Sequence, residues 1–419
     1  MNYAITDENK FLSKRIHAEE NESGYIRAPY QRDRDRILHS RAFRRLMHKT
    51  QIFNANIGDH YRNRLTHTLE VSQISRAIGK ALGLNDELIE AIALGHDLGH
   101  TPYGHVGERT LDQILKGNGI DEIKNQSEGF KHNLQSLRMV DEIETRCNEY
   151  KGINLTLAVR EGIIKHTKVR DSSGELYNYS MNNYEDMNLD QPSFTLEGQV
   201  VALSDEIAQY THDLEDGVRS GIITVDDILK FEIIKEILSK REINAENYKT
   251  IYPDAPAYNL RTIIIHDYIS LLINEAIYAS RTKIDSYTDR YKPKFCNKDD
   301  GINETCILLP EDIAQKAKEL YKEVTKKVIC SDVISVADSK SEYIIKQLFK
   351  AFIRHPRQLP DYVLTRYYSK LGLKYDRIKM DEETLRKDSF FIRIICDHIA
   401  GMTDQFASRE YRRLYLPDY

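Results

Sequence analysis

Hydrophobic and polar positions alternate along this chain with the period of an α-helix. Between Arg64 and Leu82 apolar residues recur every three or four positions, which places them on one helix face. A second apolar run begins at Asp86 and stops at the glycines of GHDLGHTPYGH, residues 95–105. The same period predicts further helices over residues 131–150, 155–168, 196–216, 225–240, 262–279, 311–327, 340–352 and 389–413. The pattern therefore predicts an all-α fold.

Two polar stretches interrupt the helical pattern. Residues 171–194 are rich in polar and turn-forming residues, which indicates a long surface loop. Residues 287–310 contain YKPK, NKDDG and ILLP, and could hold a short hairpin. We expect the second break to separate an amino-terminal core, residues 1–285, from a helical carboxy-terminal region, residues 286–419.

Composition and charge narrow the class of protein. The chain has 419 residues, of which 41% are hydrophobic and 30% charged, and its low Gly and Pro content excludes collagen-like and Pro/Gly-rich disordered classes. The net charge of −5 provides no global attraction to nucleic acid or anionic membrane. The basic run over residues 27–49 is interrupted by Asp33 and Asp35, and is interpreted as a solvated or interfacial face rather than a set of phosphate ligands.

Targeting segments and cysteine motifs are not evident in the sequence. The first ten residues lack a basic region followed by an apolar one, and the most apolar stretch, residues 263–279, carries His266, Asp267 and Glu275. The five cysteines form no C-x-x-C pair, which favours reduced thiols over a zinc ribbon or a disulfide scaffold. We therefore expect a cytoplasmic protein without a membrane partner.

The doublet His96-Asp97 is the first candidate for chemistry. A neutral imidazole beside a hard carboxylate oxygen suits Mn, Fe, Co, Ni or Mg better than a thiolate zinc site does. Such a doublet is common by chance, but His67 and Asp205 lie on two other predicted helices. The alternative roles are a core histidine bonded to a carbonyl for His67 and a solvated helix face for Asp205. The order H, HD, D resembles the HD superfamily, in which these four side chains bind a metal from three helices.

A closer resemblance covers nearly the whole chain. Residues 32–111 carry RDRDRILHSRAFRRLMHKTQIF, DHYRNRLTHTLEVSQISRAIGKALGL and EAIALGHDLGHTPYGHVGERTL. Similar signatures recur at FKHNLQSLRMVD (130–141), LSDEIAQYTHDLEDGVRSG (203–221) and DHIAGMTDQFASREYRRL (397–414). In this order and density they resemble the dGTP triphosphohydrolase family. The HD-x-x-E-D pattern of alarmone hydrolases and the GYP signature of cyclic-dinucleotide phosphodiesterases are missing.

The resemblance implies a fold, an activity and a cofactor. The fold would be an HD-domain helical core with additional helices, particularly carboxy-terminal ones that complete the active site or an oligomer interface. The activity would be hydrolysis of a deoxynucleoside triphosphate, dGTP first among them, to the deoxynucleoside and triphosphate. One divalent ion (Mn, Mg or another first-row transition metal) would be held by His67, His96, Asp97 and Asp205.

His105 and Glu108 would act as a pair by the same resemblance. An imidazole oriented by a carboxylate can hold a proton near neutral pH and move it to or from the reacting water or the 5′ oxygen. Which of these two transfers it performs stays open at this point.

Further residues are expected to contact the phosphates. Arg64 lies three positions before His67, and could therefore reach the same phosphate from one helical turn. His100, His132 and Asn133 resemble positions that line the phosphates. Their alternative roles are loop structure for His100, and capping or core packing for His132 and Asn133.

The sugar contacts include one departure from the family pattern. The resemblance assigns Gln51 to the 3′-hydroxyl and Asp213 to a complementary sugar contact. Asp205, Gln209 and Asp213 are spaced by four, which puts them on one helix face. Family members commonly read D-E-I-A-Y-x-x-H-D, with a tyrosine that blocks a 2′-hydroxyl, whereas this chain reads DEIAQYTHD. Gln209 takes the gate position and Tyr210 follows about 100° further round the helix, so sugar and base preference stay open.

Partners and alternative functions complete the hypothesis. The resemblance implies a homo-oligomer, a hexamer or a tetramer, and leaves open a nucleotide activator and single-stranded nucleic acid as further partners. One alternative is a nucleotide-sensing or nucleic-acid-binding protein that keeps the HD pocket as a ligand site. Another is an HD-fold phosphodiesterase or 5′-nucleotidase.

Overall fold

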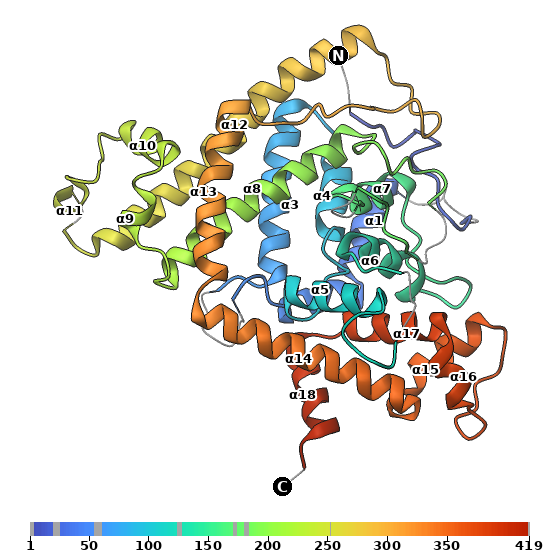
Figure 1. Ribbon diagram of the computed structural model, residues 1–419. Helices are drawn as coiled ribbons and strands as arrows, with labels where there is room; N and C mark the ends of the chain where they lie inside the picture. The colour runs from blue at the N-terminus through green and yellow to red at the C-terminus, as the bar shows by residue number, and fades with distance from the viewer. Residues whose placement is uncertain are drawn as a thin grey trace.

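The computed structural model describes residues 4–19, 26–53, 61–123, 128–170, 174–179, 184–251 and 253–417. Within these ranges the regular elements are helices, and β-structure is limited to isolated bridges such as Thr50 with Asn63. In chain order the elements are α1 (Pro29–Leu38), α2 (Arg41–Arg45), η2 (Leu46–His48), α3 (Arg64–Leu82), α4 (Asp86–Gly95), α5 (Gly104–Leu115), α6 (His132–Arg138), η4 (Met139–Ile143), α7 (Leu157–Lys165), α8 (Leu196–Arg219), α9 (Val225–Ile228), α10 (Glu232–Ser239), α11 (Tyr248–Ile251), α12 (Pro256–Arg290), α13 (Glu311–Ile329), α14 (Asp332–Arg354), η5 (Pro356–Gln358), α15 (Asp361–Lys370), α16 (Glu382–Lys387), α17 (Ser389–Ala400) and α18 (Asp404–Tyr415). The predicted all-α fold is confirmed (Figure 1).

Helix α3 has the bounds that the apolar pattern predicts. The Asn63 side chain accepts from the backbone N–H of Thr66, and the Thr66 hydroxyl accepts from Asn63, which together form a capping box. At the other end Gly83 adopts a left-handed conformation with φ of 71°, which glycine permits without steric cost. Local capping thus fixes both ends of the helix that carries His67.

Several predicted helices end or break at residues whose side chains accept a hydrogen bond from a backbone N–H group. The helix predicted over residues 131–150 stops after η4, because Glu144 is extended and its carboxylate accepts from the N–H of Ala42. The helix predicted over 225–240 is divided into α9 and α10, and the one over 389–413 into α17 and α18. The second break lies at Gly401–Thr403, where the Thr403 hydroxyl accepts from the N–H of Phe406 and starts a new helix.

The region between α12 and α13 also differs from the prediction. Helix α12 runs for 35 residues to Arg290, well past the predicted end at residue 279. The hairpin that residues 287–310 could hold is not formed, since these described residues contain no strand. The described parts of the polar stretch 171–194 are turns and irregular backbone, as predicted, while residues 171–173 and 180–183 lie outside the described ranges.

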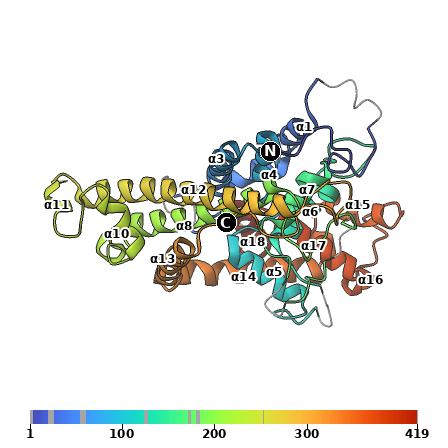
Figure 2. The same cartoon turned by 90° about the horizontal axis from the view of Figure 1, so that it is seen from above.

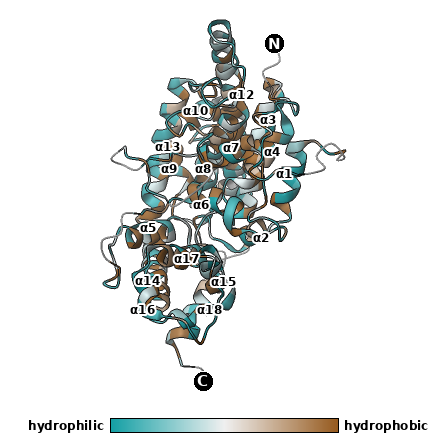
Figure 3. Ribbon diagram, turned by 90° about the vertical axis from the view of Figure 1, so that its right-hand side faces the viewer, coloured by the Kyte–Doolittle hydropathy of each residue, from teal (hydrophilic) through white to brown (hydrophobic). Residues whose placement is uncertain are grey.

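Two hydrophobic clusters make up the core. The first joins α1, α3, α4, α7, α8, α12 and α13, and Figure 3 shows apolar residues concentrated where these helices meet. The second lies among α5, α14, α15, α17 and α18. Leu111 and Ile114 of α5 belong to the second cluster, so the loop between α4 and α5 lies where the two clusters meet. The proposed division at residue 285 stays a prediction.

An arm extends from the body of the molecule. Helices α9, α10 and α11 lie at one end of the long helix α12, where α10 also contacts α13 (Figures 1 and 2). Among the described helices, none has an apolar stretch long enough to cross a bilayer.

Gly99 allows the loop after α4 to pack against α6. A Cβ at this position would lie 2.1 Å from the backbone nitrogen of Ser136 and 2.4 Å from the carbonyl oxygen of His132. The Gly99 N–H donates to the Ser136 hydroxyl, which in turn donates to the carbonyl of His96. The close approach therefore holds the end of α4 against α6.

We expect Gly99→Ala to lower the free energy of unfolding by about 1–3 kcal/mol, because backbone atoms must move to admit the methyl group. Denaturant unfolding measures this change. Gly79→Ala is the matched control: its Cβ would meet only the terminal Cδ1 of Ile89, at 2.1 Å, which a side-chain rotation relieves. Equal losses for the two variants would contradict the role of Gly99.

Candidate active site

The four side chains predicted to bind a metal converge from α3, α4 and α8. His67 Nε2 lies 3.0 Å from Asp205 Oδ1 and 4.0 Å from Asp97 Oδ2. His96 Nε2 lies 3.5 Å from Asp97 Oδ1 and 3.8 Å from Asp205 Oδ1. Ligand atoms bound about 2.1 Å from a common ion are separated by roughly 3–4 Å. The cluster could therefore hold one divalent ion.

The hydrogen bonds behind His67 leave its Nε2 lone pair facing the cluster. His212 Nε2 lies 2.5 Å from Glu70 Oε2, and because a carboxylate only accepts, this ring nitrogen donates. Burial lowers the pKa of His212 to about 4, and its Nδ1 lies 3.2 Å from Nδ1 of His67. In the tautomer in which His67 donates from Nδ1 to His212, its Nε2 presents a lone pair to the Asp205 carboxylate, 3.0 Å away. A cation between them satisfies both atoms, which fits a metal ion.

His96 is oriented in a similar way. Its Nδ1 donates to the carbonyl of Ala93 over 2.6 Å, which leaves the lone pair of Nε2 free. Nε2 is buried and has no hydrogen-bond partner within the described part of the chain. An orphaned acceptor beside two carboxylates is the arrangement that a cation would complete.

Arg64 and His100 both hold Asp97. Arg64 Nη1 donates to Asp97 Oδ2 over 2.8 Å, and His100 Nε2 donates to Asp97 Oδ1 over 3.1 Å. Burial opposes ionisation of Asp97, but His100, His96 and Arg64 hold its pKa well below its usual range. Nε and Nη2 of Arg64 are buried without a partner among the described residues. Unused guanidinium donors beside a candidate metal site are suited to a phosphate oxygen.

The predicted pair of His105 and Glu108 is close, but Glu108 has shorter contacts elsewhere. His105 Nδ1 lies 3.7 Å from Glu108 Oε2, and the His105 side chain is 55% exposed. Lys131 Nζ and His132 Nδ1 each lie 3.0 Å from the Glu108 carboxylate. Burial opposes ionisation, yet His132 and His105 hold the pKa of Glu108 well below its usual range. Glu108 is thus a carboxylate surrounded by cationic and imidazole donors, and Lys131 was missed by the sequence analysis.

His132 and Asn133 are placed differently from each other. The His132 ring stacks on His100 with centroids 4.0 Å apart, and its Nε2 lies 3.2 Å from Nε2 of His166. His166 was not identified from the sequence, although it follows an apolar helix directly and is flanked by Lys165. The Asn133 amide donates to the carbonyl of Ile164, so its donors hold the end of α7 rather than face the cleft.

Two further sets of ligand atoms lie close to the main cluster, and one of them shares Asp97 with it. One consists of Asp97, His132 and His166, and the other of His100, Glu108 and His132. Both depend on His132, which stands between the Glu108 carboxylate and His166. These contacts with a carboxylate and a second imidazole are also those of a proton-transfer chain.

An open cleft of about 940 Å³ leads from Asp205, whose side chain is 25% exposed, along α8. Gln209 and Tyr210 both line it, together with Tyr321 from α13. The Tyr210 hydroxyl donates to Glu206, and its ring centroid lies 4.7 Å from that of Tyr321. The sequence did not point to Tyr321, because it lies far beyond the HD motifs within an ordinary amphipathic helix.

The residues expected to contact the sugar, Asp213 and Gln51, are not among those that line this cleft. Asp213 is hydrogen-bonded to Tyr321, and burial together with Asp216 raises its pKa well above its usual range. Oε1 of Gln51 is buried without a partner among the described residues. The Gln51 carbonyl lies 3.4 Å from where a Cβ of Gly104 would be, so Gln51 adjoins the start of α5. Residues 54–60, which follow Gln51 closely, lie outside the described ranges.

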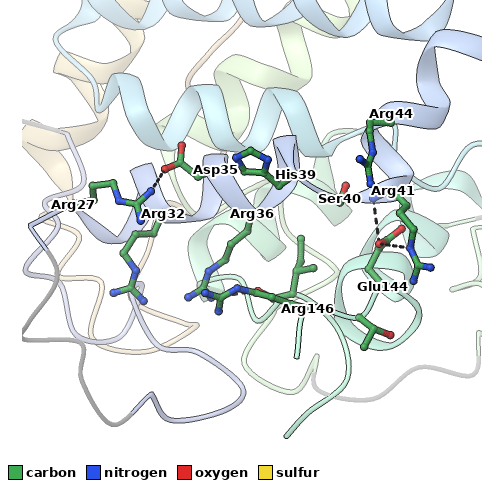
Figure 4. Close-up of a pocket in the computed structure, with 12 residues that line it drawn as sticks. Arg27, Arg32, Asp35, Arg36, His39, Ser40, Arg41, Arg44, Glu144 and Arg146 are labelled. Atoms are coloured by element: carbon green, nitrogen blue, oxygen red, sulfur yellow. Dashed lines mark hydrogen bonds and ion pairs between the residues drawn. The ribbon is translucent and has the colours of Figure 1, made fainter. Parts of the chain in front are cut away.

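An arginine-rich pocket of about 460 Å³ lies apart from these residues, along α1 and α2 (Figure 4). Its six arginines outnumber their carboxylate partners: Arg32 and Arg36 share Glu19, and Arg27 contacts Asp35. Figure 4 also shows Arg41 against Glu144, a pair separated by 3.7 Å. Arg32 and Arg36 are buried and so depart from a solvated face, and the interpretation of the whole basic run as a solvated or interfacial face stays a prediction.

Comparison with known proteins identifies two regions of the chain. The HD domain matches residues 64–209, and the phosphohydrolase-associated domain matches residues 307–413. The first region supplies His67, His96, Asp97 and Asp205, and the second begins just before α13.

Whole-chain relatives carry one consistent description. A deoxyguanosinetriphosphate triphosphohydrolase-like protein of Geobacter sulfurreducens is 36% identical over 405 residues, 96% of this chain and 92% of the relative. A protein of the same description from Nitrosomonas europaea is 36% identical over 416 residues, 99% of this chain and 97% of the relative. The chain therefore belongs to the deoxyguanosinetriphosphate triphosphohydrolase-like family of HD-domain phosphohydrolases.

Proposed function

We propose that the protein hydrolyses deoxynucleoside triphosphates, dGTP first among them, to the deoxynucleoside and triphosphate, with one divalent ion bound by His67, His96, Asp97 and Asp205. One observation carries this proposal. Arg64 buries a guanidinium directly against the His-Asp cluster with two donors that have no partner among the described residues, and an open cleft begins at Asp205 of the same cluster. A buried cation of this kind needs an anionic ligand, and a phosphate group supplies it.

Each group of residues has a separate role in the proposed cleavage of the phosphate ester. A divalent ion bound at the cluster would neutralise charge on a phosphate oxygen and supply an activated water. Arg64 uses its free donors on a non-bridging oxygen of the same phosphate. His105, exposed at the rim, exchanges a proton with the water or the 5′ oxygen, and Glu108 orients its ring. His100 and His132 lie stacked beside this path, where they would line the phosphates.

Sugar contacts extend the proposal along α8. Gln51 contacts the 3′-hydroxyl through its free amide oxygen, and Asp213 with Tyr321 forms the opposite wall. Gln209 and Tyr210 follow Asp205 along α8 and line the cleft with it. Asn133 is assigned a supporting role at the end of α7 instead of a direct phosphate contact.

Product analysis tests the function against its alternatives. The protein is incubated with each dNTP and NTP, singly and in pairs, with Mn or Mg. Release of intact triphosphate supports the proposal, whereas inorganic phosphate, pyrophosphate or nucleotide monophosphate indicates a phosphodiesterase or nucleotidase. Binding without turnover of any pair indicates a nucleotide sensor. Pairs are included because an activating nucleotide can hide activity in single-substrate assays.

Other parts of the hypothesis rest on the sequence and on the resemblance. They are the choice of metal, the homo-oligomer, the nucleotide activator, the contact with single-stranded nucleic acid and the cytoplasmic location. Each stays a prediction.

We expect Asp97→Ala and Asp205→Ala to lose both bound metal and turnover, because each removes an anionic ligand. Metal content by elemental analysis and triphosphate release are measured on the same samples. Asp299→Ala, an exposed aspartate in the irregular segment before α13, is the control and should retain both. Full metal content with unchanged turnover in Asp97→Ala would remove this residue from the ligand set.

His105→Ala should retain metal and nucleotide but lose turnover by about 10²–10⁴-fold, the usual contribution of a general acid or base. Glu108→Gln should act in the same direction, since it weakens the orientation of the ring without changing side-chain size. Single-turnover kinetics at saturating nucleotide measure the step. His266→Ala, on an exposed histidine of α12, provides the control. A wild-type rate in His105→Ala would assign the proton transfer to another group.

Sugar discrimination should be weakened by glutamine at position 209, because an amide is smaller than a phenol ring and can bond a 2′-hydroxyl. We expect Gln209→Tyr to raise the ratio of kcat/KM for a dNTP over its matching NTP. Tyr210→Ala tests the competing gate, and Tyr278→Ala, exposed on α12, is the control. If Gln209→Tyr leaves the ratio unchanged while Tyr210→Ala lowers it sharply, Tyr210 is the gate.

A further inference from the structure

The sequence motif DHIAGMTDQFASREYRRL has no part in the function proposed above, yet it faces the catalytic core. It covers the end of α17 and most of α18. Asp397 accepts from Arg138 of α6 over 2.8 Å and from Gln135 over 3.1 Å. Ala400 contacts Lys49, and Asp404 contacts Thr50, each about 350 positions earlier in the chain. Asp404 also contacts Tyr103, about 300 positions earlier. These contacts join the associated domain to the loops of the candidate active site.

Asp404 is the centre of this junction. Its side chain is buried, and one carboxylate oxygen accepts from both the N–H and the hydroxyl of Thr50, at 2.8 and 2.5 Å. The other oxygen accepts from the N–H of Tyr103 over 2.9 Å. The Tyr103 hydroxyl donates back to the Asp404 carbonyl over 3.1 Å. One carboxylate thus holds two separate loops at once, through bonds that its charge strengthens.

The two loops carry residues with different proposed roles. Thr50 precedes Gln51, which is assigned to the sugar. Tyr103 precedes Gly104 and His105, and it adopts a left-handed conformation with φ of 62°, which non-glycine residues seldom adopt unless their surroundings impose it. The bond from its N–H to Asp404 is such a constraint. Gly104 fits between the loops, since a Cβ there would lie 3.5 Å from the Thr50 carbonyl and 3.3 Å from Nη2 of Arg64.

Lys49 reinforces the same junction. Its ammonium is buried and donates to the carbonyl of His100 and, over 3.0 Å, to the carbonyl of Ala400. Burial, together with Arg45 and Arg64, lowers the pKa of Lys49 well below its usual range. Either charge state of the amine can donate to both carbonyls. The loop between α4 and α5 is therefore attached to the end of α17 at a second point.

From these contacts we propose that Asp404 is a positioning residue, which fixes the distance and angle between the sugar contact Gln51 and the proton-transfer residue His105. This inference rests on the function proposed above for those two residues. It gives the phosphohydrolase-associated domain a direct part in the reaction: it sets the geometry of a site whose metal ligands all lie in the HD domain. Displacement of a reacting group by about 1 Å costs roughly 10²-fold in rate.

The first experiment replaces the carboxylate by its amide. Asp404→Asn keeps the shape of the side chain but exchanges one acceptor for a donor. We expect kcat/KM for triphosphate release to fall roughly 10²-fold, with metal content unchanged. Hydrogen exchange followed by mass spectrometry should show faster exchange in peptides that contain the Thr50 and Tyr103 amides. Asp381→Asn is a control for the bonding pattern at an exposed position, because Asp381 also accepts from a threonine hydroxyl and two backbone N–H groups, at the start of α16.

The second experiment separates positioning from a general loss of stability. Thr50→Val removes one bond on the Gln51 side and should raise KM while kcat is kept, and Thr50→Ser, which retains the hydroxyl, should restore KM. Tyr103→Phe loosens the His105 side and should lower kcat while KM is kept. A structural role alone would move kcat and KM together in all variants, or leave both unchanged.

The outcomes distinguish this inference from the proposed function. If wild-type protein releases no triphosphate, the proposed function fails, and the exchange measurement still reports whether Asp404 holds the two loops. If wild-type protein releases triphosphate and Asp404→Asn matches it, or if Asp381→Asn loses as much, the positioning role is wrong. Should Asp404→Asn not fold, the contrast between Thr50→Val and Tyr103→Phe decides the question.

Discussion

The ion pair between Arg64 and Asp97 is the interaction on which the rest of the site depends. Both side chains are almost fully buried, and Nη1 of Arg64 lies 2.8 Å from Oδ2 of Asp97. Loss of either partner would leave an unpaired charge in the interior, at a cost of about 3–5 kcal/mol. Arg64 is also the first residue of α3, so its contact with the end of α4 sets the rotation of α3. His67, one turn further along the same helix, is thereby directed at the aspartates. The same pair leaves two guanidinium donors of Arg64 without a partner among the described residues.

Helix ends supply the second constraint. His96 and His166 each follow an apolar helix directly, and each donates from Nδ1 to the carbonyl three residues earlier, Ala93 or Ile163, over 2.6 Å. The bond uses a carbonyl that the helix end leaves free, and it fixes the tautomer so that Nε2 faces the interior. His67 reaches the same result through His212 and Glu70, because it lies within a helix whose carbonyls are already bonded. Two different kinds of hydrogen bond, to a backbone carbonyl or to another histidine, thus direct the Nε2 atoms of His96, His166 and His67 toward the interior.

The sequence predicted what depends on local pattern and missed what depends on distant contacts. The bounds of α3 follow from its apolar period and its caps, and the convergence of His67, His96, Asp97 and Asp205 follows from motifs at recognisable spacing. The break between α17 and α18 was missed, because Gly401 interrupts the apolar period too briefly to be seen. His166 and Tyr321 were missed for another reason: each lies in an ordinary amphipathic segment, and only the packing of α7 and α13 against α8 brings them to the cleft. Lys131 was passed over because a lysine at a helix start carries no motif.

The two ends of the cleft are built from different parts of the chain, and this division bears on selectivity. The His-Asp end is formed entirely by residues 64–209, whose mutual burial leaves little room for change without loss of the cluster. At the other end the wall combines Gln209 and Tyr210 of α8 with Tyr321 of α13, which belongs to the associated domain. The Tyr210 and Tyr321 rings are in contact. Together they can therefore take the place of the tyrosine ring that family members commonly have at the position of Gln209. Residue 209 alone therefore does not determine the width of this end of the cleft; the separation of α8 and α13 does so as well.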